Sequence, residues 1–205
     1  MSDKNYNKYQ ISICDEIPAM GYKVYKILES NETRNTIITS RDKSIENKFY
    51  KIHINDNGSL NSTDKKTGNT YKNVLLLQDS ADGGDSYDYS PVEDDWVIAS
   101  NDASAEVQTM SGSSFEEAQI SYRFRVPKNL ESRRNKKIDG YVDVKLNVLL
   151  PLASSNIELK FCIDNQAKDH RIRALIPQNI SAENSVADIQ FGKIKRVVYD
   201  EAIDV

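Results

Sequence analysis

FYKIHINDNGSLNSTDKKTG, residues 49–68, has the pattern of an antiparallel β-hairpin. Tyr50, Ile52 and Ile54 alternate with polar neighbours, which is typical of a strand with one buried face. Asn57-Gly58 then provides the positive φ angles that a tight hairpin turn requires. The return strand passes through Leu60 and ends at a second turn. This stretch therefore indicates an antiparallel β fold.

The same short alternating segments, divided by turn residues, continue along the rest of the chain. A buried apolar strand is expected at residues 74–77, a short strand at 36–39, and one helical turn at 129–135. The predicted fold is all-β, an antiparallel β-sandwich with little helix. The other expected strands cover residues 10–14, 21–28, 105–110, 119–126, 141–150, 157–164, 171–176, 186–191 and 194–199.

Composition narrows the class of protein. The chain has 205 residues, of which 39% are hydrophobic and 28% are charged, as in a soluble globular domain. No apolar run approaches the roughly 18 residues that span a bilayer, and the first ten residues lack the apolar core of a secretory signal. We therefore expect a cytoplasmic protein with no membrane partner.

Charge argues against nucleic acid as a partner. The net charge is −4 and the isoelectric point is about 5.3, whereas a protein that binds the phosphate backbone is usually basic. One local basic cluster is interpreted as a solvated loop; it contains Arg133, Arg134, Lys136 and Lys137.

An acidic stretch, QDSADGGDSYDYSPVEDDW at residues 78–96, is the first candidate for function. Crowded carboxylates repel one another, and the Gly83-Gly84 pair raises the entropic cost of ordering the loop. A solvated turn is one interpretation, and a loop that presents aromatic rings and carboxylates to a sugar is another. A third is a calcium loop, although the spacing differs from that of the helix-loop-helix calcium motif. The aspartates that recur every third residue are Asp79, Asp82, Asp85 and Asp88.

The remaining reactive residue types do not suggest a catalytic or metal site within this chain. Cys14 and Cys162 lie in apolar strand patterns and are interpreted as buried, reduced thiols. His53 and His170 are interpreted as surface residues rather than ligands, so no metal site is expected. Glycoside hydrolysis needs two carboxylates that flank the scissile bond, whereas all those of the acidic stretch lie on one strip. We therefore expect no catalytic residue here.

Four segments together resemble glycoside hydrolase family 38, the α-mannosidases and bacterial mannosylglycerate hydrolases. GGDSYDYSP followed by VEDDW resembles a loop signature of the family, and the hairpin at residues 49–68 resembles the hairpin before it. IDNQAKDHRIRALIP (residues 163–177) resembles a later strand pair, and DEIPAMGYKVYKI (15–27) the end of a preceding small β domain. The matches come in family order over about residues 15–177.

This resemblance implies a domain organisation. Family enzymes are several times longer, with an N-terminal catalytic β/α barrel that holds the nucleophilic Asp and a zinc ion, followed by helices and β-sandwich domains. Residues 1–43 are then expected to be the end of a small β domain plus a linker, and residues 44–205 a large, supersandwich-like domain that stops early. No cofactor is expected here, and zinc is expected in the missing barrel. A sandwich that ends there leaves strand edges open and favours self-association.

The resemblance also implies a function. Family members are zinc-dependent enzymes that cleave α-mannosides with retention of configuration, and the loop that matches residues 83–91 lines their substrate pocket. By position, the substrate-binding residues are Tyr87, flanked by Asp85 and Asp88, with Tyr89 if the alignment slips. Val92 stands where relatives often have a second proline. The alternative is a free-standing carbohydrate-binding module that stacks sugars on Trp96 and the two tyrosines. In either case the isolated chain is expected to be inactive.

Overall fold

The computed structural model describes residue 15 and residues 17–28, 38–85, 87–178 and 180–198. Within them it contains fourteen strands, one 3-10 turn at Ser100–Asp102 and one short helix, α1 (Leu130–Arg134). All strand pairs are antiparallel. The predictions of an all-β fold and of a helical turn near residues 129–135 are confirmed.

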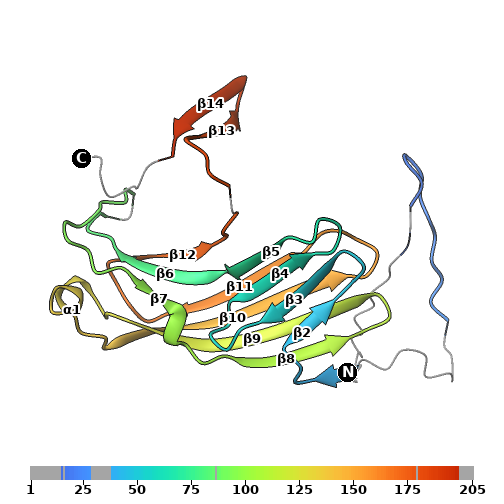
Figure 1. The fold of residues 1–205 in the computed structure, drawn as a ribbon, viewed down its shortest axis with the longest axis horizontal. Helices are drawn as coiled ribbons and strands as arrows, with labels where there is room; N and C mark the ends of the chain where they lie inside the picture. Colours follow the sequence, from blue (N-terminus) through green and yellow to red (C-terminus); the bar gives the residue numbers. More distant parts are fainter. Residues whose placement is uncertain (1–14, 16, 29–37, 86, 179, 199–205) are drawn as a thin grey trace, which may run out of the picture.

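A five-stranded sheet forms one layer of the sandwich, in the order β1-β8-β9-β10-β11 (Figure 1). Its two central strands pair along twelve residues each and alternate between core and solvent, as a period of two requires. On β10, every second residue from Val142 to Leu150 is at most 1% exposed. The strands are β1 (Ile38–Ser40), β8 (Glu106–Ser111), β9 (Phe115–Val126), β10 (Gly140–Pro151) and β11 (Glu158–Asn165).

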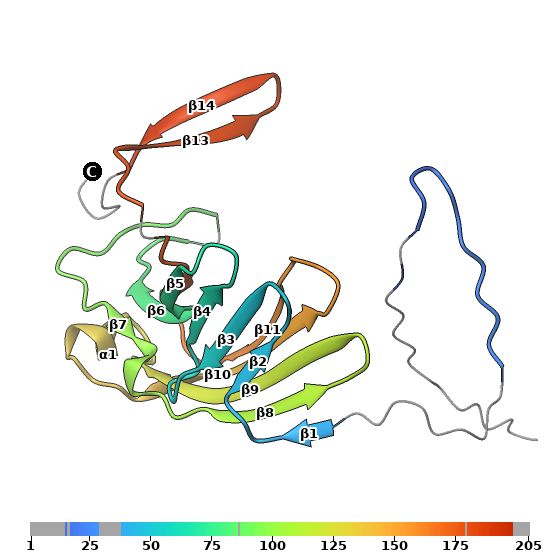
Figure 2. The same cartoon turned by 45° about the vertical axis from the view of Figure 1, so that its right-hand side comes forward.

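A four-stranded sheet covers part of the inner face of that layer (Figure 2). Ile45, Ile52 and Ile54 project from it into the core, where they join the buried residues of β9 and β10. Burial of such side chains contributes roughly 1.5–3 kcal/mol each. The strands are β2 (Ser44–Glu46), β3 (Tyr50–Ile54), β4 (Leu60–Asp64) and β5 (Thr70–Val74), paired in sequence order.

The predicted hairpin at residues 49–68 is present as β3 and β4, with Ile54 opposite Leu60. Its turn is longer than a two-residue connection, because the Asn55 N–H bonds to the Ser59 carbonyl at 2.8 Å. Only Gly58 has a positive φ, of +83°, and a Cβ there would lie 2.7 Å from the Tyr122 ring. Glycine is therefore required at this position by both conformation and space.

A third sheet, in the order β12-β6-β7, joins segments that are far apart in sequence. β6 (Leu76–Ala81) lies between β12 (His170–Leu175) and β7 (Ile98–Ala99). β6 contributes the buried Leu77 to the core and contains the first four residues of the acidic stretch, Gln78 to Ala81. The predicted buried strand at residues 74–77 is thus displaced by two residues, because residues 73 and 75 have positive φ angles and kink the chain between β5 and β6.

Several sequence predictions are corrected outside the sandwich layers. Residues 21–28 contain no strand, and the expected partner strand at residues 10–14 lies outside the described residues. Cys162 is exposed on the edge strand β11, so the prediction of a buried thiol is wrong there; Cys14 lies outside the described residues. The hairpin of β13 (Asn184–Ile189) and β14 (Gly192–Val197) stands apart from the layers (Figures 1 and 2). None of the helices in the described residues is long and apolar enough to cross a membrane.

Candidate functional site

The acidic stretch forms a loop between β6 and β7, at the same end of the sandwich as α1 (Figure 1). We call residues 82–94 the acidic loop, and we call the buried side chains beneath it the anchor cluster. The anchor cluster consists of Asp79, Asp95, Arg133 and His170. Its members come from β6, the return limb of the loop, α1 and β12.

Arg133 is the centre of the anchor cluster. Its side chain is only 4% exposed, and its Nη2 donates to Oδ2 of Asp79, which is fully buried. Its Nη1 donates to the Trp96 carbonyl at 2.5 Å and lies 3.5 Å from Oδ1 of Asp95. One guanidinium therefore contacts both the strand that enters the loop and the limb that leaves it. The interpretation of Arg133 as part of a solvated loop is wrong, whereas its neighbour Arg134 is exposed.

His170 is the second partner of Asp79 in the anchor cluster. Its side chain is 3% exposed, and its Nδ1 lies 2.5 Å from Oδ1 of Asp79. Its Nε2 lies 3.0 Å from Oδ1 of Asn165, an oxygen that also accepts the Ala167 N–H. Both ring nitrogens thus lie against side-chain oxygens, and the ring connects β12 to Asp79 of β6. The interpretation of His170 as a surface residue is wrong.

Asp95 closes the anchor cluster by joining the two limbs of the loop. Its Oδ2 accepts the Ala81 N–H at 2.8 Å, while its Oδ1 faces Arg133. The anchor cluster thus combines two carboxyl groups, one guanidinium and one imidazole. A buried ionic group of this kind is stable only when its charges are paired and hydrogen-bonded.

Hydrogen bonds within the loop shape its tip. Oδ1 of Asp82 accepts the N–H groups of Gly84 and Ser90 at 2.9 and 3.1 Å, which draws the two limbs together. Oδ1 of Asp85 accepts the N–H groups of Tyr87 and Asp88 at 2.8 and 3.1 Å. These backbone bonds hold the pKa of the Asp85 carboxyl below its ordinary value, because they stabilise the ionised form.

Three of the four predicted substrate-binding residues lie together at the tip. The two tyrosines differ in their surroundings. Asp85, Tyr87 and Asp88 are all exposed, and Tyr87 is 93% exposed. Tyr89 is 38% exposed, and the guanidinium carbon of Arg171 lies 3.7 Å from the centre of its ring. Tyr87 is thus presented to solvent, while Tyr89 is held against β12.

The aspartates that recur every third residue in the acidic stretch point to different partners. Asp79 binds Arg133 and His170, whereas Asp82 and Asp85 accept backbone N–H groups in separate turns. In the described part of the chain, no group of three or more His, Cys, Asp or Glu side chains is arranged to hold a metal ion. The described residues therefore do not fit the zinc site that the resemblance implies for the family.

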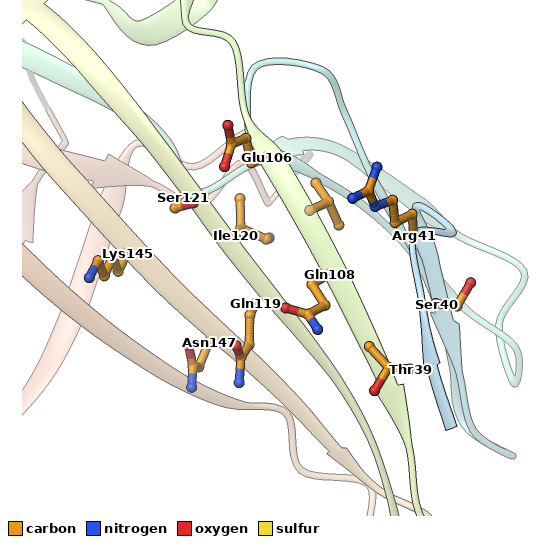
Figure 3. A pocket seen from close by; sticks show the side chains of 11 residues that line it. Thr39, Ser40, Arg41, Glu106, Gln108, Gln119, Ile120, Ser121, Lys145 and Asn147 are labelled. Atoms are coloured by element: carbon orange, nitrogen blue, oxygen red, sulfur yellow. The ribbon is translucent and has the colours of Figure 1, made fainter. Parts of the chain in front are cut away.

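Apart from the acidic loop, a hollow of about 820 Å³ lies on the outer face of the five-stranded sheet (Figure 3). Gln108, Gln119 and Asn147 lie side by side across it, because β8, β9 and β10 pair in that register. None of the described residues that line it is aromatic. It lacks the stacking surface of a typical sugar site and is separate from the acidic loop.

The sequence analysis located the acidic loop but did not identify Arg133 and His170 of the anchor cluster as its support. Arg133 belongs to a run of basic residues, and nothing local distinguishes it from Arg134. His170 follows the polar segment NQAKD, so its pattern is that of a turn residue. Only the pairing of β6 with β12, which places His170 opposite Ala81, brings it to the loop.

Comparisons with known proteins agree with this fold. Residues 45–202 match the family model described as the C-terminal domain of glycosyl hydrolases family 38. A Halalkalibacterium halodurans protein that is provisionally named a mannosylglycerate hydrolase is 26% identical over 194 residues, which cover 86% of this chain and 22% of that protein.

Two crystal structures from Enterococcus faecalis share the fold. One, an α-mannosidase of strain V583, has a TM-score of 0.66 and 24% identity over 83% of this chain and 21% of its own. The other, a family 38 protein, has a TM-score of 0.65 and 25% identity over 82% of this chain and 22% of its own. The chain spans about a fifth of the length of these relatives. It belongs to glycosyl hydrolase family 38, of which it matches the C-terminal domain.

Proposed function

We propose that this chain is the non-catalytic C-terminal sandwich of an α-mannosidase-type glycoside hydrolase that retains configuration. In this proposal a separate catalytic domain holds the nucleophile and the zinc ion. The acidic loop completes the substrate pocket that this domain forms. The observation that supports the proposal most directly is the loop itself, because a buried, charge-paired anchor cluster holds a tip whose Tyr87 is 93% exposed. A rigid base beneath exposed polar and aromatic groups is typical of a ligand-binding loop.

The chemistry of the tip suits a sugar. The Tyr87 hydroxyl can donate to or accept from a sugar hydroxyl, and its ring can cover the C–H face of a pyranose. Asp85 uses only Oδ1 for the backbone of the turn, and the carboxylate of Asp88 is exposed, so both residues can accept hydroxyl hydrogen bonds. The loop thus contributes binding and orientation, while bond cleavage belongs to the catalytic domain.

A free-standing carbohydrate-binding module is less favoured by the geometry. Its stacking platform would need Tyr87, Tyr89 and Trp96 together, but Arg171 covers one face of Tyr89. Trp96 lies on the return limb, where its carbonyl binds Arg133. Of the three rings, only that of Tyr87 is almost fully exposed.

The test is Tyr87→Phe in a complete enzyme that contains this chain together with its catalytic domain. One hydrogen bond to a neutral sugar hydroxyl contributes roughly 0.5–1.5 kcal/mol, so kcat/KM for an α-mannoside should fall about two- to tenfold. Tyr89→Phe is the matched control and should have a smaller effect. Unchanged kcat/KM in both variants would contradict the proposal and would show that the loop is a solvated turn.

A second measurement addresses the isolated chain. With a chromogenic α-mannoside, the 205-residue protein should release no leaving group, with or without added zinc. Turnover by the pure protein that rises with zinc would overturn the assignment of catalysis to another domain.

A further inference from the structure

We propose that Arg133 is a positioning residue that sets the direction of the acidic loop, and that Tyr89 with Arg171 belongs to the same support, which leaves Tyr87 as the ring that meets the substrate. This inference rests on the proposed function for its catalytic consequence. The structural part, that Arg133 holds the loop in place, stands on the geometry alone.

The guanidinium of Arg133 joins the two limbs of the acidic loop. Arg133 binds Asp79 at the end of the entering strand and Asp95 and the Trp96 carbonyl on the returning limb. A planar guanidinium can donate in two directions at once, whereas a lysine ammonium is a single point charge on a flexible stem. Lysine at this position would therefore keep the charge beside Asp79 and lose the link to the other limb.

The buried charges of the anchor cluster have a desolvation cost. Burying charges loses their hydration, and a well-packed apolar replacement is often equally stable or more stable. The buried ion pairs of the anchor cluster are therefore weak evidence for added stability. What an apolar group could not reproduce is the fixed direction of the hydrogen bonds to Asp95 and Trp96.

Two neighbouring side chains of β12 contact the loop and its base. His170 reaches the anchor cluster, and the next residue, Arg171, lies over the Tyr89 ring at 3.7 Å. Successive residues on a strand point to opposite faces, so one strand can support both the base and the returning part of the tip. The backbone adds a third link, since the Asp82 N–H donates to the Asp169 carbonyl at 3.0 Å.

These contacts divide the two tyrosines. Tyr89 is committed to β12, whereas Tyr87 follows the Asp85 turn and is almost fully exposed. A change in the anchor cluster would thus act on the substrate through the placement of Tyr87.

The structural test compares Arg133→Lys with Arg134→Lys in the 205-residue chain by amide hydrogen exchange. Arg133→Lys should speed exchange at Ala81, Gly83 and Ser90 by about tenfold or more and leave β9 and β10 unchanged; Arg134→Lys should change neither. Asp95→Ala is the second variant if Arg133→Lys does not fold, and it should release the same amides. Unchanged loop exchange in a folded variant would overturn the positioning role.

The catalytic test is a double-mutant cycle in the complete enzyme. Arg133→Lys should lower kcat/KM about tenfold with Tyr87 present, and by much less in the Tyr87→Phe background, because the two residues act through one contact. A full additional loss in that background would show that Arg133 does not act through Tyr87. If Tyr87→Phe is silent while Arg133→Lys still loosens the loop, the proposed function fails and the structural role of Arg133 stands.

Discussion

The base and the tip of the acidic loop are held by different kinds of contact. The anchor cluster is 0–15% exposed, and it joins residues from four segments of the chain. The tip is exposed, and the hydrogen bonds that the Asp82 and Asp85 carboxylates accept all come from residues of the loop itself. Contacts between distant segments of the chain therefore determine where the loop points. Hydrogen bonds within the loop determine the shape of its tip. Substitutions should separate these two properties.

The largest effect is expected at the base, for Arg133→Met. This change leaves the buried carboxylate of Asp79 without its main partner, and loss of one member of a buried ion pair costs about 3–5 kcal/mol. Urea denaturation of the 205-residue chain should show this decrease in the free energy of unfolding. Arg134→Met, on the same helix but exposed, should change it by less than about 0.5 kcal/mol. Equal effects of the two changes would remove the distinction between base and surface.

A smaller, local effect is expected at the tip for Gly84→Ala. A Cβ on Gly84 would lie 1.9 Å from the Asp88 carbonyl oxygen, so the turn must rearrange and should lose about 0.5–1.5 kcal/mol of hydrogen bonding. Amide chemical shifts should change at residues 84–90 and remain constant in β9 and β10. In Gly83→Ala the added Cβ would lie 3.2 Å from the Val92 side chain and 3.7 Å from the Ser90 carbonyl oxygen, so smaller shifts are expected. Shift changes that spread from Gly84 into the core would contradict a locally determined tip.

Acid should loosen the tip of the loop at the Asp85 turn. The pKa of Asp85 is lowered in the folded loop by the backbone bonds from Tyr87 and Asp88, so this stabilisation is complete above the unfolded pKa of about 3.9. It is lost as the pH falls through the lower folded pKa. Exchange protection of the Tyr87 and Asp88 amides should therefore disappear at acidic pH. In Asp85→Asn, whose amide oxygen can still accept these bonds, protection should not depend on pH in that range; equal pH dependence in both proteins would exclude Asp85 as the cause.

The smallest effect on stability is expected for Tyr87→Ala. A side chain that is 93% exposed contributes little to folding, so the free energy of unfolding should change by less than about 0.5 kcal/mol. Tyr89→Ala should cost about 0.5–1 kcal/mol, because it removes the contact with Arg171. Parallel thermal denaturation of the two variants measures this difference. A larger loss for Tyr87 would place its ring in the support rather than at the exposed tip.

Local patterns predicted most of the fold. The alternation in residues 49–68 and in the later strands located β3, β4 and β8 to β14 to within a few residues, because each of these strands has one buried face or a clear turn beside it. β2 and β5 were missed, since a three-residue strand and a polar edge strand have little pattern to detect.

Alternation could not predict which faces are covered. Leu159 and Ile163 lie opposite the buried Val148 and Val144, yet they are 42% and 43% exposed. β11 is the last strand of its sheet, and in the described part of the chain only β10 pairs with it. Cys162 lies on the other face of β11, opposite the exposed Lys145 of β10, and so faces solvent. Whether a strand is central or at an edge is a property of the whole topology, not of its own sequence.

The candidate site was predicted at its tip and missed at its base for a related reason. Asp85, Tyr87 and Asp88 lie within four positions of one another, so a short motif can identify them. Asp79 lies 54 positions from Arg133 and 91 positions from His170. Without the register of β6 and β12, no local signal joins these residues.

The separation of these residues along the chain also bears on the order of folding. β8 to β11 can form by successive hairpins, each closing a short loop, whereas the pairing of β6 with β12 must wait for residues through Leu175. Contacts that close long loops form slowly because their entropic cost comes first. During synthesis, Asp79 and Arg133 leave the ribosome well before His170. The loop is then expected to reach its final orientation in a late step, after the five-stranded layer has formed.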